Sequence, residues 1–101
     1  MHIGKALEAI RRAYGISTKD FRELLGIHKD AYILIKDGNN PSKQAIEGYA
    51  KKLKLPHVEL IYMFAAEEKD TPAQKLEAFK ILMPPAKGLA LQLLKENWNK
   101  K

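Results

Sequence analysis

Several polar side chains between residues 17 and 43 have the chemistry to bind phosphate groups. Serine, threonine and asparagine can hydrogen-bond a phosphate oxygen, and lysine and arginine supply positive charge. Ser17 and Thr18 would lie at a helix N-terminus, where free backbone N–H groups favour anions. Solvation, helix capping and turn formation explain the same residue types equally well. The candidate phosphate-binding residues are Ser17, Thr18, Lys19, Arg22, Asn39, Asn40 and Lys43.

A second candidate surface lies on residues 28–36, which have the pattern of an amphipathic helix. With successive residues 100° apart, Tyr32 and Ile35 share the inner face. The outward-facing residues are then Lys29, Asp30, Ile33, Leu34 and Asp37. Lysine can contact base edges in the major groove, and an apolar side chain can touch a thymine methyl group. Because lysines and aspartates offset each other here, the adjacent Ile33 and Leu34 can equally mark a protein-binding patch.

No catalytic or metal-binding pattern accompanies these residues. His2, His28 and His57 are far apart in the sequence, and their spacing matches no metal motif. The absence of cysteine excludes a disulfide and a thiolate zinc site. Asp30 and Asp37 would lie roughly 10 Å apart on a helix, which is loose for a shared catalytic site. We therefore expect no enzymatic activity, no cofactor and no metal.

The elements that must position these side chains are helices. Hydrophobic spacing and capping residues predict helices over 3–14, from 17 or 18 to 25, over 28–36, over 42–53 and over 57–66. Gly26 predicts a tight turn between the second and third helices, because it tolerates left-handed backbone angles. A charged linker over 67–70 is expected to lead into a sixth helix, with Thr71 as its cap and Pro72 at its first position. Pro84 and Pro85 are expected to separate this helix from a seventh, which ends near Trp98.

Composition restricts the class of protein. The 101 residues are 46% hydrophobic and 30% charged, which is ordinary for one folded domain and excludes a disordered chain. The net charge of +6 permits a nucleic-acid partner without requiring one. No apolar run is long enough to span a bilayer, and the first residues lack the pattern of a signal peptide. We expect a cytoplasmic protein.

Spaced residues along 3–61 agree with one known pattern. Its first helix begins with an isoleucine–glycine pair and ends near an arginine, and glycines mark the entry to the second helix, the central turn and the end of the third. The matching residues are Ile3, Gly4, Leu7, Arg11, Gly15, Ile16, Ser17, Gly26, Ile27, Gly38 and Pro41, followed by helices over 45–53 and 58–61. In these residues the chain resembles the Xre family, the helix-turn-helix domain of Cro and lambda-type repressors. The resemblance implies an all-α, five-helix, lambda-repressor-like domain that binds DNA.

The chain departs from the family pattern at three places. Arg22 stands where the family usually has alanine, four residues before the turn glycine. Thr18 stands where a phosphate-binding glutamine is common. Ile33 and Leu34 stand where the family's third helix is usually polar. The last departure keeps open an alternative, in which the scaffold has lost base readout and binds a protein partner through these two residues.

The C-terminal third lies outside the resemblance. We divide the chain into a helix-turn-helix domain over 1–66 and a two-helix extension over 67–101. Leucines are spread widely around the last helix, so it needs to be buried on more than one side. The candidate dimerisation residues are Leu89, Leu91, Leu93 and Leu94. A simple enlargement of the monomer core is the other interpretation.

Together these observations predict a transcriptional regulator that binds double-stranded operator DNA as a homodimer, because helix-turn-helix proteins commonly read two half-sites.

Overall fold

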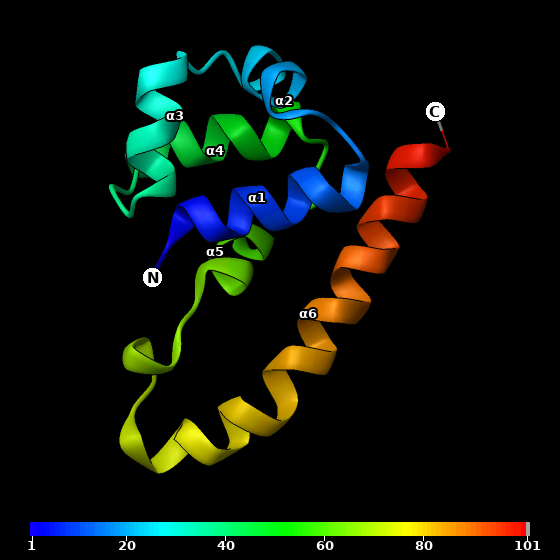
Figure 1. Ribbon diagram of the computed structural model, residues 1–101. Coiled ribbons are helices and arrows are strands. Elements are labelled where there is room, and N and C mark those ends of the chain that lie inside the picture. Colours follow the sequence, from blue (N-terminus) through cyan, green and yellow to red (C-terminus); the bar gives the residue numbers. More distant parts are fainter. Residues whose placement is uncertain (101) are drawn as a thin grey trace.

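Capping residues decide where several of the helices begin and end. The computed structural model describes residues 1–100, which form helices joined by short turns (Figure 1). Ser17 and Ser42 cap two of the helices, since each hydroxyl accepts a hydrogen bond from the N–H group three residues later. The all-helical class is confirmed for these residues. The helices are α1 (Ile3–Tyr14), α2 (Thr18–Leu25), α3 (Lys29–Lys36), α4 (Lys43–Lys52), α5 (Glu59–Ala65) and α6 (Leu76–Asn99), with the 3-10 helices η1 (Glu68–Asp70) and η2 (Ala73–Lys75) between the last two.

The core is built around α1. Its residues Ile3, Leu7 and Ile10 are fully buried, at the spacing that places them on one side of a helix. This helix packs against α3, α5 and α6, and Figure 1 shows it in the middle of the molecule. Tyr14 ends α1 and donates a hydrogen bond from its hydroxyl to the carbonyl of Leu53 at 3.0 Å, which joins α1 to the end of α4. Burial raises the pKa of Tyr14 to about 12, so the hydroxyl stays a donor.

The first and third helices touch at Gly4. A Cβ atom on this residue would lie 2.3 Å from the carbonyl oxygen of Ile35 and 2.8 Å from Cα of Lys36. Both atoms belong to the backbone of α3, so they cannot move away by a side-chain rotation. The absence of a side chain at position 4 therefore sets how closely α3 lies on α1.

Helices α2 and α3 are joined by a turn centred on Gly26. This glycine has φ = 70°, which is the left-handed conformation expected for it. The N–H group of Ile27 donates a hydrogen bond to the carbonyl of Arg22 at 2.9 Å and closes the turn. Phe21 of α2 and Tyr32 of α3 meet edge to face with ring centroids 6.2 Å apart. The turn and these rings hold the two helices as one unit.

The expected break at Pro84 and Pro85 is wrong. Residues 76–99 form one helix, α6, with both prolines inside it, in place of a two-helix extension. Figure 1 shows the axis changing direction between its yellow and orange parts. The proline φ near −65° is compatible with a helix, and what is lost is the N–H donor for each carbonyl four residues earlier. These carbonyls belong to Lys80 and Ile81, which are exposed, so water can replace the missing donors.

The segment before α6 also differs from expectation. Residues 67–70 link α5 to the segment before α6, and within them Glu67 and Asp70 cap each other's backbone around η1. The last helix begins at Leu76 and not at Pro72, because η2 intervenes. Although α6 is the longest element, no helix within residues 1–100 combines the length and apolar character needed to cross a membrane.

The C-terminal half of α6 packs on α1. Leu94 is only 6% exposed and belongs to the same core as the residues of α1. Trp98 stacks on Tyr14, with ring centroids 4.3 Å apart and an angle of 7° between the planes. This part of the extension therefore enlarges the monomer core.

Candidate nucleic-acid interface

A notch between α2 and α3, beside the outward face of α3, is lined by four basic side chains. Its volume is about 350 Å³, and we call it the basic notch. Tyr32 and Ile33 form an apolar floor. Basic side chains come from both helices, and no carboxylate lines it. The lining residues are Thr18, Lys19, Arg22, Lys29, Tyr32, Ile33 and Lys36.

The four cations of the basic notch form no ion pair among residues 1–100, although the charge of Lys36 acts on Glu8 and helps to lower its pKa. Among residues 1–100, the ion pairs of the structure involve other groups, and none includes Lys19, Arg22, Lys29 or Lys36. The three lysines are exposed and Arg22 is half-buried. The ammonium group of Lys36 lies 6.0 Å from the centroid of the Tyr32 ring. The notch thus presents concentrated positive charge to solvent.

A hydrogen-bonded network fixes α3 in place behind the notch. The hydroxyl of Tyr32 donates to Oε2 of Glu8 at 2.7 Å, and Arg11 donates to both carboxylate oxygens of Glu8 at 3.1 Å. Arg11 also donates to the carbonyl of Ile16 at 2.8 Å, which ties down the turn before α2. Burial would raise the pKa of Glu8, but the hydrogen bonds from Arg11 and Tyr32 outweigh it and hold the pKa below its usual value. Glu8 is therefore a charged anchor for both helices.

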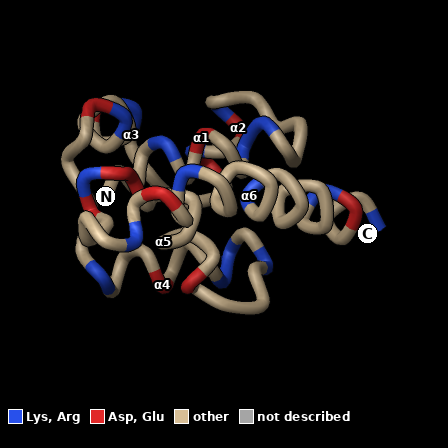
Figure 2. Tube along the Cα trace, turned by 90° about the horizontal axis from the view of Figure 1, so that it is seen from below, with Lys and Arg blue, Asp and Glu red and all other residues tan. Residues whose placement is uncertain are grey.

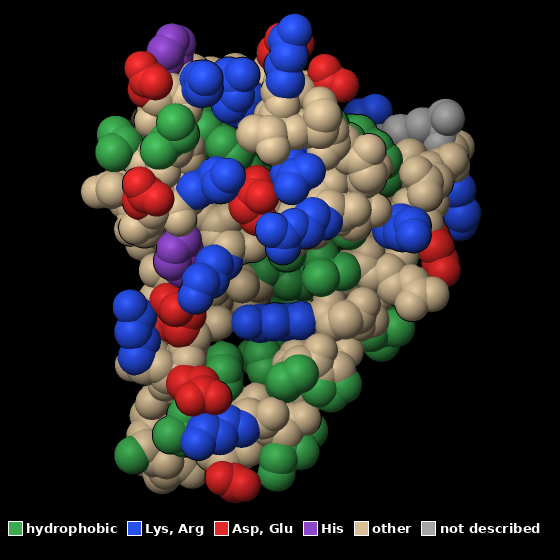
Figure 3. Space-filling view, in the orientation of Figure 1, with side chains coloured by type: hydrophobic (Ala, Val, Ile, Leu, Met, Phe, Trp, Pro, Cys, Tyr) green, Lys and Arg blue, Asp and Glu red, His purple; other side chains and the backbone are tan. Residues whose placement is uncertain are grey.

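The outward face of α3 has two sides of opposite charge. Ile33 faces the basic notch together with Lys29 and Lys36. Leu34, Asp30 and Asp37 do not line the notch, and because both aspartates stand about one turn from Ile33 as well, Ile33 lies where the two sides meet. Figure 2 shows both signs of charge along α3, and Figure 3 shows hydrophobic and charged side chains side by side over this helix.

All of the base-facing candidates are exposed, as the helical spacing predicted. Ile33 is 47% exposed and Leu34 is 55% exposed. The inner residues Tyr32 and Ile35 are buried, so the orientation of α3 predicted from the sequence is confirmed.

The candidate phosphate-binding residues do not all meet in one place. Thr18, Lys19 and Arg22 line the basic notch, whereas Ser17, Asn39, Asn40 and Lys43 do not. Ser17 and Lys43 are exposed at the starts of α2 and α4. Asn39 donates from its amide to the carbonyl of Leu34 at 3.1 Å.

Asn40 has a structural role instead. Its Oδ1 accepts a hydrogen bond from the N–H of Ile3 at 3.0 Å, and its Nδ2 donates to the carbonyl of Met1 at 3.2 Å. Both functional atoms hold the first residues against the turn after α3. We therefore leave Asn40 out of the proposed phosphate contacts.

The four candidate dimerisation leucines divide into two pairs. Leu89 and Leu93 are 63% and 55% exposed. Leu94 is buried in the monomer core, and Leu91 packs partly against that core. The assignment of Leu94 and Leu91 to a dimer surface is corrected, because α6 turns that side toward α1.

Two features of the site were not predicted from the sequence. Lys36 lines the basic notch, and its position three residues after Ile33 was the signal that could have placed it there. The hydrogen bond between Tyr32 and Glu8 joins residues that are 24 positions apart, and no local sequence pattern predicts it.

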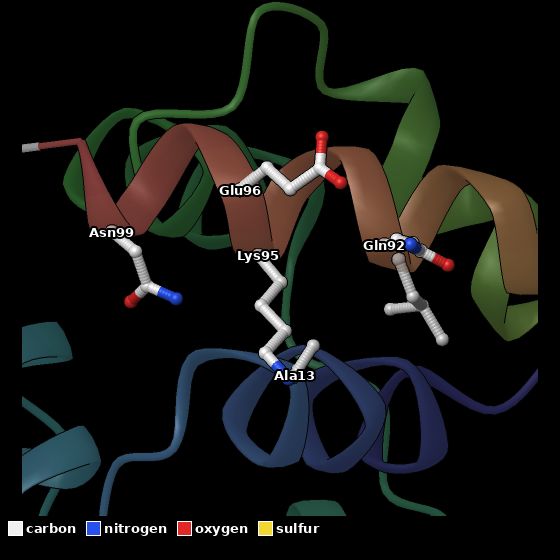
Figure 4. A pocket seen from close by; sticks show the side chains of 6 residues that line it. Ala13, Gln92, Lys95, Glu96 and Asn99 are labelled. Carbon is white, nitrogen blue, oxygen red and sulfur yellow. The ribbon is translucent and has the colours of Figure 1, made fainter.

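A second hollow, of about 360 Å³, lies between α1 and α6. Figure 4 shows the Lys95 side chain reaching toward α1 beside Ala13, while Glu96 points away from it. One cation, one carboxylate and two amides line it, and Figure 4 shows Lys95 and Glu96 pointing in different directions. Within residues 1–100, no three metal-binding side chains converge on a point.

No protein-family model, curated protein or solved structure matches the chain. The functional conclusion therefore rests on the site itself.

Proposed function

We propose that the chain is a DNA-binding transcriptional regulator, with α1–α5 forming a lambda-repressor-like helix-turn-helix domain of the Xre type. It would act in the cytoplasm by occupying double-stranded operator DNA, without catalysis. The observation that carries the proposal is the basic notch beside the outward face of α3. An α-helix with its side chains is about 10–12 Å across, which suits a major groove about 12 Å wide. The outward face of α3 is free of other elements of the domain along Lys29, Ile33 and Lys36, which are exposed. With α3 in the groove, Lys19 and Arg22 of α2 would face the phosphates of the adjoining backbone.

The proposal includes a homodimer formed through α6. Leu82, Leu89 and Leu93 recur at spacings of seven and four, which places them in one stripe, and each is more than half exposed. Their covering partner would be the same stripe of a second copy, because a two-fold dimer buries identical surfaces against each other. Such a dimer would present two α3 helices to two half-sites.

Salt dependence of duplex binding tests the DNA proposal. Each phosphate contact adds about 0.9 to the slope of log affinity against log salt concentration, so several contacts give a steep fall. Lys19→Ala should flatten this slope by about one and weaken all sequences similarly. Lys80→Ala is the matched control, because it removes the same charge from an exposed position on α6. A folded protein that binds no duplex at low salt contradicts the proposal.

Sedimentation at micromolar concentration tests the dimer. Leu89→Lys places a charge inside the proposed stripe and should yield a monomer. Ile81→Lys is the control, since Ile81 is 62% exposed but lies outside the stripe. A monomeric unsubstituted chain, or equal effects of the two substitutions, contradicts an interface at this stripe.

One observation favours a second function, in which the domain binds a protein partner. Ile33 and Leu34 are adjacent, apolar and about half exposed, which is costly unless something covers them. On this alternative, DNA binding is absent and both residues contribute to the interface. Duplex binding at low salt that weakens with Lys19→Ala decides against it.

A further inference from the structure

Ile33 and Leu34 are neighbours in the sequence, but only Ile33 lines the basic notch. Ile33 shares the basic notch with Lys29 and Lys36 of its own helix and with Lys19 and Arg22 of α2. None of these cations forms an ion pair among residues 1–100, although the charge of Lys36 also acts on Glu8. Asp30 and Asp37 lie about one helical turn from both Ile33 and Leu34, but neither aspartate lines the notch, and Leu34 does not line it either. A polyanion is therefore attracted to the side of α3 on which Ile33 meets the basic notch, and the two aspartates disfavour it on the side of Leu34.

The surroundings of Ile33 also hold it rigidly. The residue before it, Tyr32, is buried, touches Phe21 edge to face and donates its hydroxyl to the charged Glu8. The side chain of isoleucine is itself stiff, because the branched Cβ restricts its first torsion angle. Ile33 thus presents a fixed apolar surface, 47% exposed, beside the cations of the basic notch.

This arrangement matches one feature of the DNA major groove. Ile33 has no hydrogen-bonding group, so it cannot read the donors and acceptors of base edges. The apolar group in that groove is the C5 methyl of thymine. We infer that Ile33 is a specificity-determining residue that recognises the thymine methyl group, while the surrounding cations hold the adjacent phosphates. This inference rests on the proposed DNA-binding function and names what its reading helix recognises.

The test replaces thymine by deoxyuridine, which removes only the methyl group and leaves every hydrogen-bonding atom in place. The full chain is first used to select its preferred duplexes from a random-sequence pool at low salt. Each thymine of a selected half-site is then replaced in turn, and Kd is measured. We expect one position at which the replacement weakens binding about fourfold, which corresponds to roughly 0.8 kcal/mol for one buried methyl group.

Matched protein variants assign that effect to a residue. Ile33→Ala should bind the thymine and deoxyuridine duplexes equally, and Leu34→Ala should keep the fourfold preference. Both positions are exposed, so both variants should fold, and circular dichroism checks this. Ile33→Val keeps the branched carbon and should retain part of the preference, which preserves a measurement if Ile33→Ala binds too weakly.

The outcomes distinguish a failure of the inference about Ile33 from a failure of the proposed DNA-binding function. Binding to no duplex at low salt overturns both. Duplex binding that is indifferent to deoxyuridine at every position overturns the inference and leaves the proposed function standing. A preference that survives Ile33→Ala, or that is lost in Leu34→Ala, also overturns the assignment to Ile33.

Discussion

Replacing Gly4 with alanine tests the contact that sets α3 on α1. The added Cβ would lie 2.3 Å from the carbonyl oxygen of Ile35, whereas ordinary contact begins near 3.4 Å. The neighbouring atoms are backbone, so relief requires the two helices to separate by about 1 Å. Such a shift would also stretch the hydrogen bond between Tyr32 and Glu8, whose length is now 2.7 Å.

The expected change in the free energy of unfolding combines one stabilising effect and two destabilising effects. Alanine in place of glycine inside a helix stabilises it by roughly 0.5–1 kcal/mol. Overpacking costs roughly 1–3 kcal/mol, and weakening a hydrogen bond to a charged group costs about 1.5–3 kcal/mol. We expect a net loss of about 3 kcal/mol in the free energy of unfolding, out of the roughly 5–15 kcal/mol of a whole domain.

Urea denaturation followed by circular dichroism and by fluorescence of Trp98 measures this loss. Gly48→Ala is the matched control, because it is also helical and a Cβ there has no atom within 4 Å. The control should gain about 0.5–1 kcal/mol. If Gly4→Ala instead behaves like Gly48→Ala, the close approach of α1 and α3 is refuted.

Three further predictions concern other parts of the fold. Lys54 has φ = 58°, so Lys54→Gly should stabilise the chain by about 1 kcal/mol in urea denaturation; a loss would contradict the strained backbone. The lowered pKa of Glu8 contributes stability that is fully present above its ordinary value of 4.5 and is lost as the pH falls through the lower folded value. Because Tyr32→Phe removes a bond that lowers this pKa, the variant should lose less stability on acidification; an unchanged pH dependence would exclude this role. Trp98→Ala removes the stack on Tyr14 and should cost about 2 kcal/mol in thermal or urea unfolding, with no cost if α6 does not dock there.

The first five helices could be predicted because their signals are local. Ser17 and Ser42 accept hydrogen bonds from backbone N–H groups three residues away, and Gly26 acts through its own backbone angle. The break expected at Pro84 and Pro85 failed for a physical reason. A proline pair removes two hydrogen-bond donors, but the φ angle of proline is compatible with a helix, and here α6 bends and continues through both residues.

The candidate site was predictable in its residues and not in its arrangement. Helical spacing correctly placed Ile33 and Leu34 on the outer face of α3. Summed over the outward face of α3, the charges of two lysines and two aspartates cancel. This sum does not tell which side of the helix each charge occupies. The positive side depends on Lys19 and Arg22, which come from another helix, and their proximity arises only from tertiary packing.

The central position of α1 has a consequence for amide hydrogen exchange. Its buried side contacts α3, α5 and α6, so its backbone hydrogen bonds open only when several helices detach together. Exchange at the amides of Leu7 and Ile10 should therefore report the global unfolding equilibrium of the chain. The part of α6 around Pro84 and Pro85 has lost two of its own helical hydrogen bonds and lies mostly in solvent, so it opens by local fluctuations at far lower cost. Amide exchange is therefore expected to be slow in α1, which holds α3 in its position. It is expected to be faster in the exposed part of α6, which can open without moving α3.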